Sequence, residues 1–309
     1  MIEKEAKNLS SDIYNRSAVE SAREGLFAIL SEQVLENPNS LLLLPSYIGW
    51  SPNEGSGLMD PVLAAKIDFH FYDVNGVLEP VAQELNGLLS TDRHIVLLLV
   101  HYFGKRSVLP PTTISIIRDR GHSIIEDWAH DLSRFFEPRL ELCDDHFEIF
   151  SIHKWTASKA GGLVRGNIRK ISSTQIKAAQ KEDIEVLIST NIHEVFRIRW
   201  ENYRNLDSNL ISNGKFRRFW SSLDEVTCPL NYPMVLKSKN DRSELYEFLT
   251  EQGIYPTALY HKLTEKLNRE IFPDAYFLAD TILNLPIHQD CSPSNISELV
   301  TAVNLWALG

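Results

Sequence analysis

The sequence is poor in cysteine and has no long hydrophobic run. Only Cys143, Cys228 and Cys291 occur among 309 residues, an odd number at wide spacing. This pattern excludes a disulfide framework and a CxxC site, and it favours a reducing compartment. The longest apolar runs, 41–44 and 95–100, are too short to span a bilayer. The amino-terminal residues are charged, so no targeting segment is predicted and we expect a cytoplasmic protein.

Positive charge and several catalytic motifs are also lacking. The formal net charge is −10, with no basic stripe, which argues against a nucleic-acid surface. The ten histidines form no HxxxH or HxH cluster with carboxylates, so a metal site is not expected. GxSxG, Walker-type and GxGxxG sequences are absent as well.

The first half of the chain alternates strand-like and helix-like segments, which predicts an α/β fold with a mostly parallel sheet covered on both faces. Ligands of such sheets bind beyond the carboxyl ends of the strands. The expected helices are 21–35, 61–65, 81–89 and 112–120, and the expected strands are 40–44, 67–72, 94–101, 122–125 and 147–152.

The second half has a different character. Residues 173–206 are polar and predict one long helix. Beyond them, strands are expected at 228–236 and 281–287, and helices at 241–251 and 292–308, the last with Ser292 or Ser294 as its N-cap. We therefore predict a large domain, 1–192, joined through the long helix to a small α+β domain, 193–309.

Two charged side chains follow predicted buried strands. A carboxylate at Asp127 can keep the ring nitrogen of a pyridine cofactor protonated, although an aspartate that caps the next helix fits equally well. Lys154 can form a Schiff base and then act as general acid and base, although a lone lysine is more often a surface residue. Lys159 is a rival, but it lies two residues before Gly161 in an expected turn, so we prefer Lys154.

A phosphate site is predicted at the start of the first helix. Ser21, Ala22 and Arg23 open this helix, whose free amides would bind an anion, with a contact from the guanidinium. Simple N-capping by Ser21 is the alternative. Ser151 could supply a hydroxyl to the same phosphate, or it could be an ordinary polar strand residue.

Aromatic and histidine residues supply further candidates. Tyr47 and Trp50 follow one strand and His101 follows another, so any of these rings could lie on a planar cofactor, or simply in the core. His130, three residues after Asp127, could support that carboxylate or cap a helix.

Taken in order, these strings resemble the DegT/DnrJ/EryC1/StrS family of pyridoxal-phosphate enzymes. The resemblance covers most of the chain and rests on six motifs in the family's order. They are SAREGLFAIL at 21–30, LPSY at 44–47, VHYFG at 100–104, IEDWAH at 125–130, SIHK at 151–154 followed by the glycine pair 161–162, and LNLPIH at 283–288.

The resemblance implies a fold type I aminotransferase with pyridoxal 5'-phosphate as cofactor. Lys154 would carry the Schiff base, while Asp127 would bind the pyridine nitrogen. The substrates would be an amino acid, glutamate by preference, and a keto-sugar carried on a nucleotide. The family also implies a homodimer with shared active sites, in polysaccharide or other sugar biosynthesis.

Departures from the family keep two alternatives open. Some relatives are sugar dehydratases with histidine in place of the lysine, and His153 adjoins Lys154 here. A cofactor-binding protein with little catalysis is the other alternative. It is motivated by the three-residue spacing from Ser151 to Lys154 and by the lack of the family's GYN segment.

Overall fold

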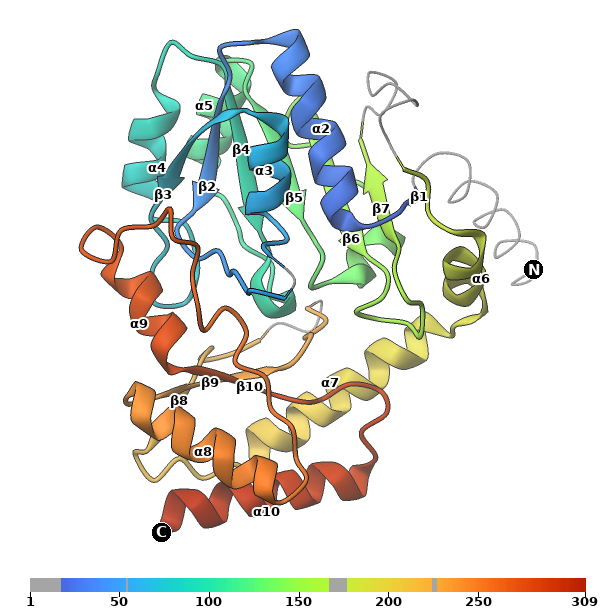
Figure 1. Ribbon diagram of the computed structural model, residues 1–309, viewed down its shortest axis with the longest axis vertical. Helices are drawn as coiled ribbons and strands as arrows, with labels where there is room; N and C mark the ends of the chain where they lie inside the picture. The colour runs from blue at the N-terminus through green and yellow to red at the C-terminus, as the bar shows by residue number, and fades with distance from the viewer. Residues whose placement is uncertain (1–17, 54, 167–176, 224–226) are drawn as a thin grey trace.

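A seven-stranded sheet forms the centre of the larger part of the molecule in the computed structural model, which describes residues 18–53, 55–166, 177–223 and 227–309 (Figure 1). The strand order is β1-β7-β6-β5-β4-β2-β3. Strands β2 to β6 pair in parallel, whereas β7 runs antiparallel to both of its neighbours. The strands are β1 (Ala18–Val19), β2 (Leu41–Pro45), β3 (Asp68–Tyr72), β4 (Ile95–Val100), β5 (Ser123–Asp127), β6 (His146–Ser151) and β7 (Gly162–Arg165).

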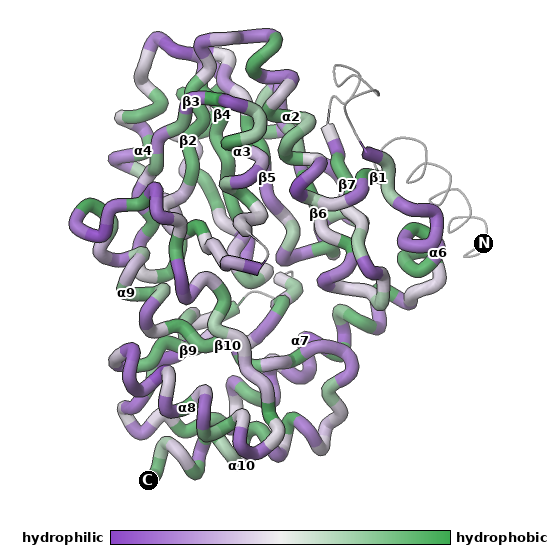
Figure 2. Tube along the Cα trace, in the orientation of Figure 1, coloured by the Kyte–Doolittle hydropathy of each residue, from purple (hydrophilic) through white to green (hydrophobic). Residues whose placement is uncertain are grey.

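The parallel strands are buried because helices cover the sheet. Every residue of β4 is apolar and buried, and Figure 2 shows hydrophobic residues along the central strands. Helices α2 (Ala22–Glu36) and α3 (Met59–Ala65) pack against each other in front of the sheet, and α5 (Pro111–Asp119) lies behind it beside α4 (Ala82–Leu89) (Figure 1). This arrangement confirms the predicted α/β sheet.

A three-stranded antiparallel sheet, in the order β10-β9-β8, forms the second part. Helix α7 (Ile192–Asn209) leads to it from the larger sheet, and α10 (Pro293–Leu308) packs on α7 and α8. The other elements of this part are β8 (Phe216–Arg218), β9 (Tyr232–Leu236), α8 (Lys239–Glu251), α9 (Pro273–Thr281) and β10 (Ile282–Leu285). Helix α6 (Lys181–Ser189) lies instead beside the larger sheet, in a buried cluster with Phe150 and Leu163 (Figure 1). None of the helices in the described ranges is long and apolar enough to cross a bilayer, and all three cysteines are free.

The predicted long helix at 173–206 is wrong. Residues 173–176 lie outside the described residues, and the remainder is divided between α6 and α7. Asn191 caps α7 by accepting a hydrogen bond from Glu194 N–H, which starts a new helix where the sequence lacks a glycine or proline signal. By contrast, the expected cap at Ser292 is confirmed, since Ser292 and Asn295 form a reciprocal capping box.

Gly162 brings the start of α2 against the edge of β7. A Cβ at this position would lie 2.4 Å from Ala22 N and 2.5 Å from Ser21 C, so any side chain would push α2 away. Gly162 is also the register partner of Ser151 across the β6–β7 pair. The absent side chain therefore places the amino end of α2 opposite the carboxyl end of β6.

We predict that Gly162→Ala lowers the free energy of unfolding by about 1–3 kcal/mol, because the added methyl group would overlap the α2 backbone. Urea denaturation measures the change. Gly87→Ala in α4 is the matched control: no atom lies within 4 Å of its added Cβ, so stability should stay equal or rise. Equal stability of Gly162→Ala and wild type would contradict this close approach.

Candidate active site

Asp127 is the last residue of β5 and lies at the edge where the parallel strands end. Its register partners are Val100 at the end of β4 and Ile149 near the end of β6. The carboxylate is only 8% exposed and accepts a hydrogen bond from Ala129 N–H, 2.8 Å away. Burial raises the pKa of Asp127, although Ala129 N–H and the charge of Lys154 oppose that rise. A cationic partner at this carboxylate would therefore be strongly favoured.

Lys154 lies three residues beyond the end of β6, in a turn rather than at the strand end as expected. The N–H groups of Trp155 and Thr156 both donate to Ile152 O, at 3.0 and 3.1 Å, which closes the turn. The charge of Lys154 lowers the pKa of both Asp127 and His130, so its ammonium lies within electrostatic range of the two side chains. The predicted lysine and aspartate thus meet at one edge of the sheet.

His130, three residues after Asp127, is buried and is held in one tautomer. Its Nδ1 accepts a hydrogen bond from Phe103 N–H at 3.1 Å, so the ring proton lies on Nε2. Burial, and then the charge of Lys154, lowers the pKa of His130 well below its usual range, which keeps the ring neutral. A neutral Nε2–H donor therefore lies within electrostatic range of the lysine.

Tyr260 reaches this group from a segment more than a hundred residues further along the chain, and the sequence analysis missed it. Its hydroxyl lies 3.5 Å from His130 Nε2. The backbone has φ of 59°, which side-chain-bearing residues rarely adopt and which often marks a functional site. A Cβ on Gly49 would come within 2.0 Å of the Tyr260 ring, so that glycine makes room for it. The positive φ can be read only from the folded backbone.

The predicted phosphate site combines the start of α2 with the end of β6. Ser21 Oγ accepts from Glu24 N–H at 3.1 Å, so this hydroxyl caps the helix, as the simpler interpretation had it. The Ala22 amide lies against Gly162, opposite Ser151. The Ser151 hydroxyl contacts His153 Nδ1 at 3.1 Å. The Arg23 guanidinium pairs with Asp60 of α3 at 3.4 Å.

Three aromatic or histidine rings were predicted as candidates to lie on a planar cofactor, and the structure gives each a different environment. His101 stacks on Trp128 with ring centroids 3.3 Å apart. Tyr47 is buried and packs edge-on against Tyr260. Trp50 lies under the Lys262 ammonium at 4.3 Å. Of these three, His101 and Tyr47 adjoin the residues around Asp127, whereas the described contacts of Trp50 join it to the segment that carries Tyr260.

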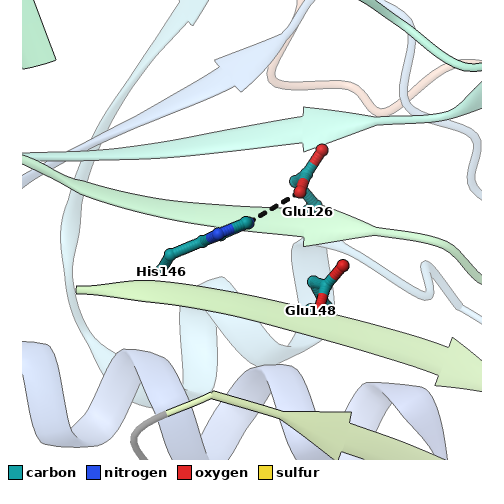
Figure 3. A group of neighbouring side chains, drawn as sticks. All are labelled: Glu126, His146 and Glu148. Carbon is teal, nitrogen blue, oxygen red and sulfur yellow. Dashed lines mark hydrogen bonds and ion pairs between the residues drawn. The ribbon is translucent and has the colours of Figure 1, made fainter. Parts of the chain in front are cut away.

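A buried charge network lies directly behind Asp127. Glu126 of β5 and Glu148 of β6 are register partners, so two carboxylates face the same core region (Figure 3). Glu126 accepts from His101 Nε2 at 3.1 Å and from His146 Nε2 at 2.6 Å. The histidine Nδ1 atoms accept backbone N–H groups of Ser107 and Leu142, which fixes both tautomers. Two neutral N–H donors therefore hold Glu126.

Guanidinium groups compensate Glu148. Arg165 binds it through Nε at 2.6 Å and Nη2 at 2.9 Å, and Arg134 Nε lies 3.2 Å away. Arg139 Nε is 3.6 Å away. The oxygen and nitrogen atoms of Glu126, His146 and Glu148 lie within 4.8 Å of one another, as in a metal site. With N–H donors already on these carboxylates and cations around Glu148, the group is better explained as an ion-pair network than as metal ligands.

Solved structures provide the comparison with known proteins, since no protein-family model and no curated protein matches the chain. The aminotransferase TlmJ of Streptoalloteichus hindustanus matches with a TM-score of 0.71 at 20% identity, over 94% of this chain and 85% of that one. PseC of Helicobacter pylori, an aminotransferase of pseudoaminic acid biosynthesis, gives 0.73 at 14%, over 94% and 86%. A DegT DnrJ EryC1 StrS aminotransferase of Brucella abortus gives 0.73 at 15%, over 99% and 90%.

At these identities the likeness concerns the fold. The chain has the architecture of these aminotransferases, so the predicted fold type I arrangement is confirmed. In this chain, Asp127, Lys154 and His130 lie at the edge where the parallel strands end.

We predict that Glu126→Gln lowers the free energy of unfolding at pH 7 by about 2–3 kcal/mol, because an amide would replace a carboxylate that accepts from two buried histidines. Burial favours a raised pKa, but the hydrogen bonds from His101 and His146 outweigh it and hold the pKa of Glu126 well below its usual range.

The pH dependence gives a second readout of the same variant. A lowered folded-state pKa stabilises the fold above the unfolded value of about 4.3, and that stabilisation is lost as the pH falls toward the folded value. The difference between wild type and Glu126→Gln should therefore narrow below about pH 4. Exposed Glu251→Gln should follow wild type throughout. A difference that stays constant from pH 7 to pH 3 would contradict the assignment.

Proposed function

We propose that the protein is a pyridoxal-phosphate-dependent aminotransferase that moves an amino group from an amino acid, with glutamate as first choice, to a nucleotide-linked keto-sugar. The observation that carries the proposal is the meeting of buried Asp127 with Lys154 at the carboxyl edge of the parallel sheet. The likeness in fold to aminotransferases supports it, as does the order of the sequence motifs.

The chemistry of the side chains present fits this cofactor. The Asp127 carboxylate, with its pKa raised by burial, is suited to a pyridinium N–H. The first amides of α2 and the Ser151 hydroxyl, brought together by Gly162, are suited to a phosphate. Lys154 would hold the cofactor through Nζ. These residues would give each end of the cofactor a partner and Lys154 would provide one for its aldehyde.

When bound, pyridoxal phosphate supplies an electron sink. Asp127 would hold the proton on the ring nitrogen, and His130, neutral with its proton on Nε2, would support that carboxylate without adding charge. Lys154 Nζ would take a proton from the α-carbon of the amino donor and return a proton to the acceptor carbon. Tyr260, half-buried at the same edge, would help to exclude water.

We extend the proposal to the domain boundary, the oligomeric state and the biological setting of the protein. We place the boundary between the large and small domains at residues 192 and 193, with α7 as the joining helix. We propose a cytoplasmic homodimer with shared active sites that works in sugar or polysaccharide biosynthesis. PseC, an aminotransferase of pseudoaminic acid biosynthesis, supports a sugar setting for the same fold.

Lys154→Ala should abolish the visible absorbance that arises when the cofactor is attached through the lysine Nζ and reduce transamination by at least about a hundredfold, because it removes both the attachment atom and the proton carrier. Absorbance spectra and single-turnover assays measure the two effects. Lys159→Ala is the matched control: the Lys159 side chain is exposed and its backbone N–H, which donates to Asp183, is unaffected by the substitution. Retention of both properties in Lys154→Ala would reject the proposal.

Product analysis separates transamination from the two alternatives, a sugar dehydratase of the same family and a cofactor-binding protein with little catalysis. His153 next to Lys154 is the observation behind the dehydratase. With cofactor, glutamate and nucleotide-linked keto-sugars supplied, transamination yields 2-oxoglutarate and an amino sugar in equal amounts. Loss of a sugar hydroxyl without 2-oxoglutarate would instead establish the dehydratase, and bound cofactor without product would favour the binding protein.

A further inference from the structure

Arg199 of α7 is a buried cation whose hydrogen bonds join three separate parts of the chain. It is 3% exposed. Nη2 donates to Lys154 O at 2.9 Å, and Nη1 donates to Leu230 O at 3.2 Å. Gln289 Oε1 accepts from Nε at 3.1 Å and from Nη2 at 3.0 Å. The guanidinium also lies over the Trp155 ring, 4.2 Å from its centroid.

The hydrogen-bond partners of Arg199 are all uncharged. Within the part of the chain that the structure describes, the hydrogen bonds of this guanidinium go to two backbone carbonyls and one amide oxygen, and no carboxylate oxygen forms an ion pair with it. Burial lowers the pKa of Arg199 to about 10, which still leaves it protonated at neutral pH. A buried cation without a carboxylate at ion-pair distance is costly to the fold, although the charge of Asp290 offsets part of that cost. Hydrophobic packing alone therefore does not account for an arginine here.

The contact with Lys154 constrains how that residue projects. Arg199 fixes the Lys154 carbonyl, and the ring stacking fixes the next residue, Trp155. The turn itself is closed from the other side by Ile152 O, which accepts from the N–H groups of Trp155 and Thr156. The planar peptide group between Lys154 and Trp155 is therefore held at its carbonyl oxygen and at its N–H. This restricts the orientation of the Lys154 backbone and, with it, the direction of the Lys154 Cα–Cβ bond.

The same guanidinium ties this direction to the carboxyl-terminal part of the chain. Leu230 precedes β9, and Gln289 follows β10, so both acceptors belong to the segments around the three-stranded sheet. Asn202 lies one turn further along α7 and is similarly buried. Its Nδ2 donates to Ile287 O and Cys291 O, each at 3.2 Å, but not to the lysine turn. Asn202 thus provides an internal comparison for Arg199.

We propose that Arg199 is a positioning residue for Lys154, which aims the lysine side chain and links its orientation to the seating of the segments around β9 and β10. The effect of Arg199 on catalysis rests on the proposed function, in which Lys154 carries the proton. The structural content of the inference, a lysine turn held by Arg199, stands on the contacts alone.

The first test uses hydrogen–deuterium exchange on the protein without added cofactor. Arg199→Gln should raise the exchange rates of the Trp155 and Thr156 amides at least about tenfold, because the turn loses its outer contacts. Asn202→Ala, the control, should raise exchange around 287–291 and leave 152–156 at the wild-type rate. Equal exchange at 152–156 in the two variants would overturn the proposal.

Arg199→Lys is measured in the same way, so that a failure of Arg199→Gln to fold does not end the test. Lysine keeps the charge but loses the planar fork that reaches Lys154 O and Gln289 together. Exchange at 152–156 should again exceed that of Asn202→Ala, and wild-type exchange in Arg199→Lys would overturn the proposal.

The second test reports on the Lys154 amino group itself. With pyridoxal phosphate bound, the midpoint of the pH titration of the visible absorbance should shift by at least about half a pH unit in Arg199→Lys and stay unchanged in Asn202→Ala. An unshifted midpoint despite faster exchange would overturn the claim that Arg199 aims the side chain. If wild type binds no cofactor, the proposed function fails, and the exchange experiment alone decides the role of Arg199.

Discussion

Three carboxylates, those of Glu126 and Asp127 on β5 and of Glu148 on β6, are buried away from solvent. Each loses its hydration and needs hydrogen-bond donors or cations in place of water, and much of the surrounding structure supplies them. Glu126 is satisfied by two neutral histidines and Glu148 by arginines from outside β5 and β6. Asp127, by comparison, accepts a backbone N–H and otherwise depends on the more distant charge of Lys154. The fold thus compensates two of these charges internally and leaves the third, at the sheet edge, suited to an external cation. That difference distinguishes the structural carboxylates from the one that we assign to a cofactor.

The carboxyl-terminal part of the chain completes the site from outside the larger sheet. The segment that carries Tyr260 forms backbone hydrogen bonds with the residues after β2, through Trp50 N–H to Lys262 O and Thr264 N–H to Ile48 O. Arg199, which also donates to Gln289, holds the lysine turn through the Lys154 carbonyl. Both contacts cross between the two sheets. Small shifts between the sheets would therefore reach Lys154 and Tyr260 before they disturbed the core strands.

The sequence predicted those features that depend on local pattern. Continuous apolar runs predicted the parallel strands. Strand β5 ends at Asp127 and β6 ends at Ser151, close to the positions at which the sequence predicted cofactor-binding residues. The short strands β1, β7 and β8 were missed because they are two, four and three residues long and carry no periodic signal. The break before α7 was missed because an asparagine cap, rather than glycine or proline, makes it. Arg199 and Tyr260 could not be predicted, since their partners are 45 and 130 positions away in the chain.

The contacts of Arg199 also bear on the order in which the molecule assembles. They join residues 45 and 90 positions apart, so closing them costs more chain entropy than pairing the neighbouring strands of the larger sheet. On the ribosome, the lysine turn is made well before Gln289 emerges. We expect the sheet to be complete while Lys154 is still unconstrained. The chain would then acquire a structured core first and a competent lysine only as its last segments dock.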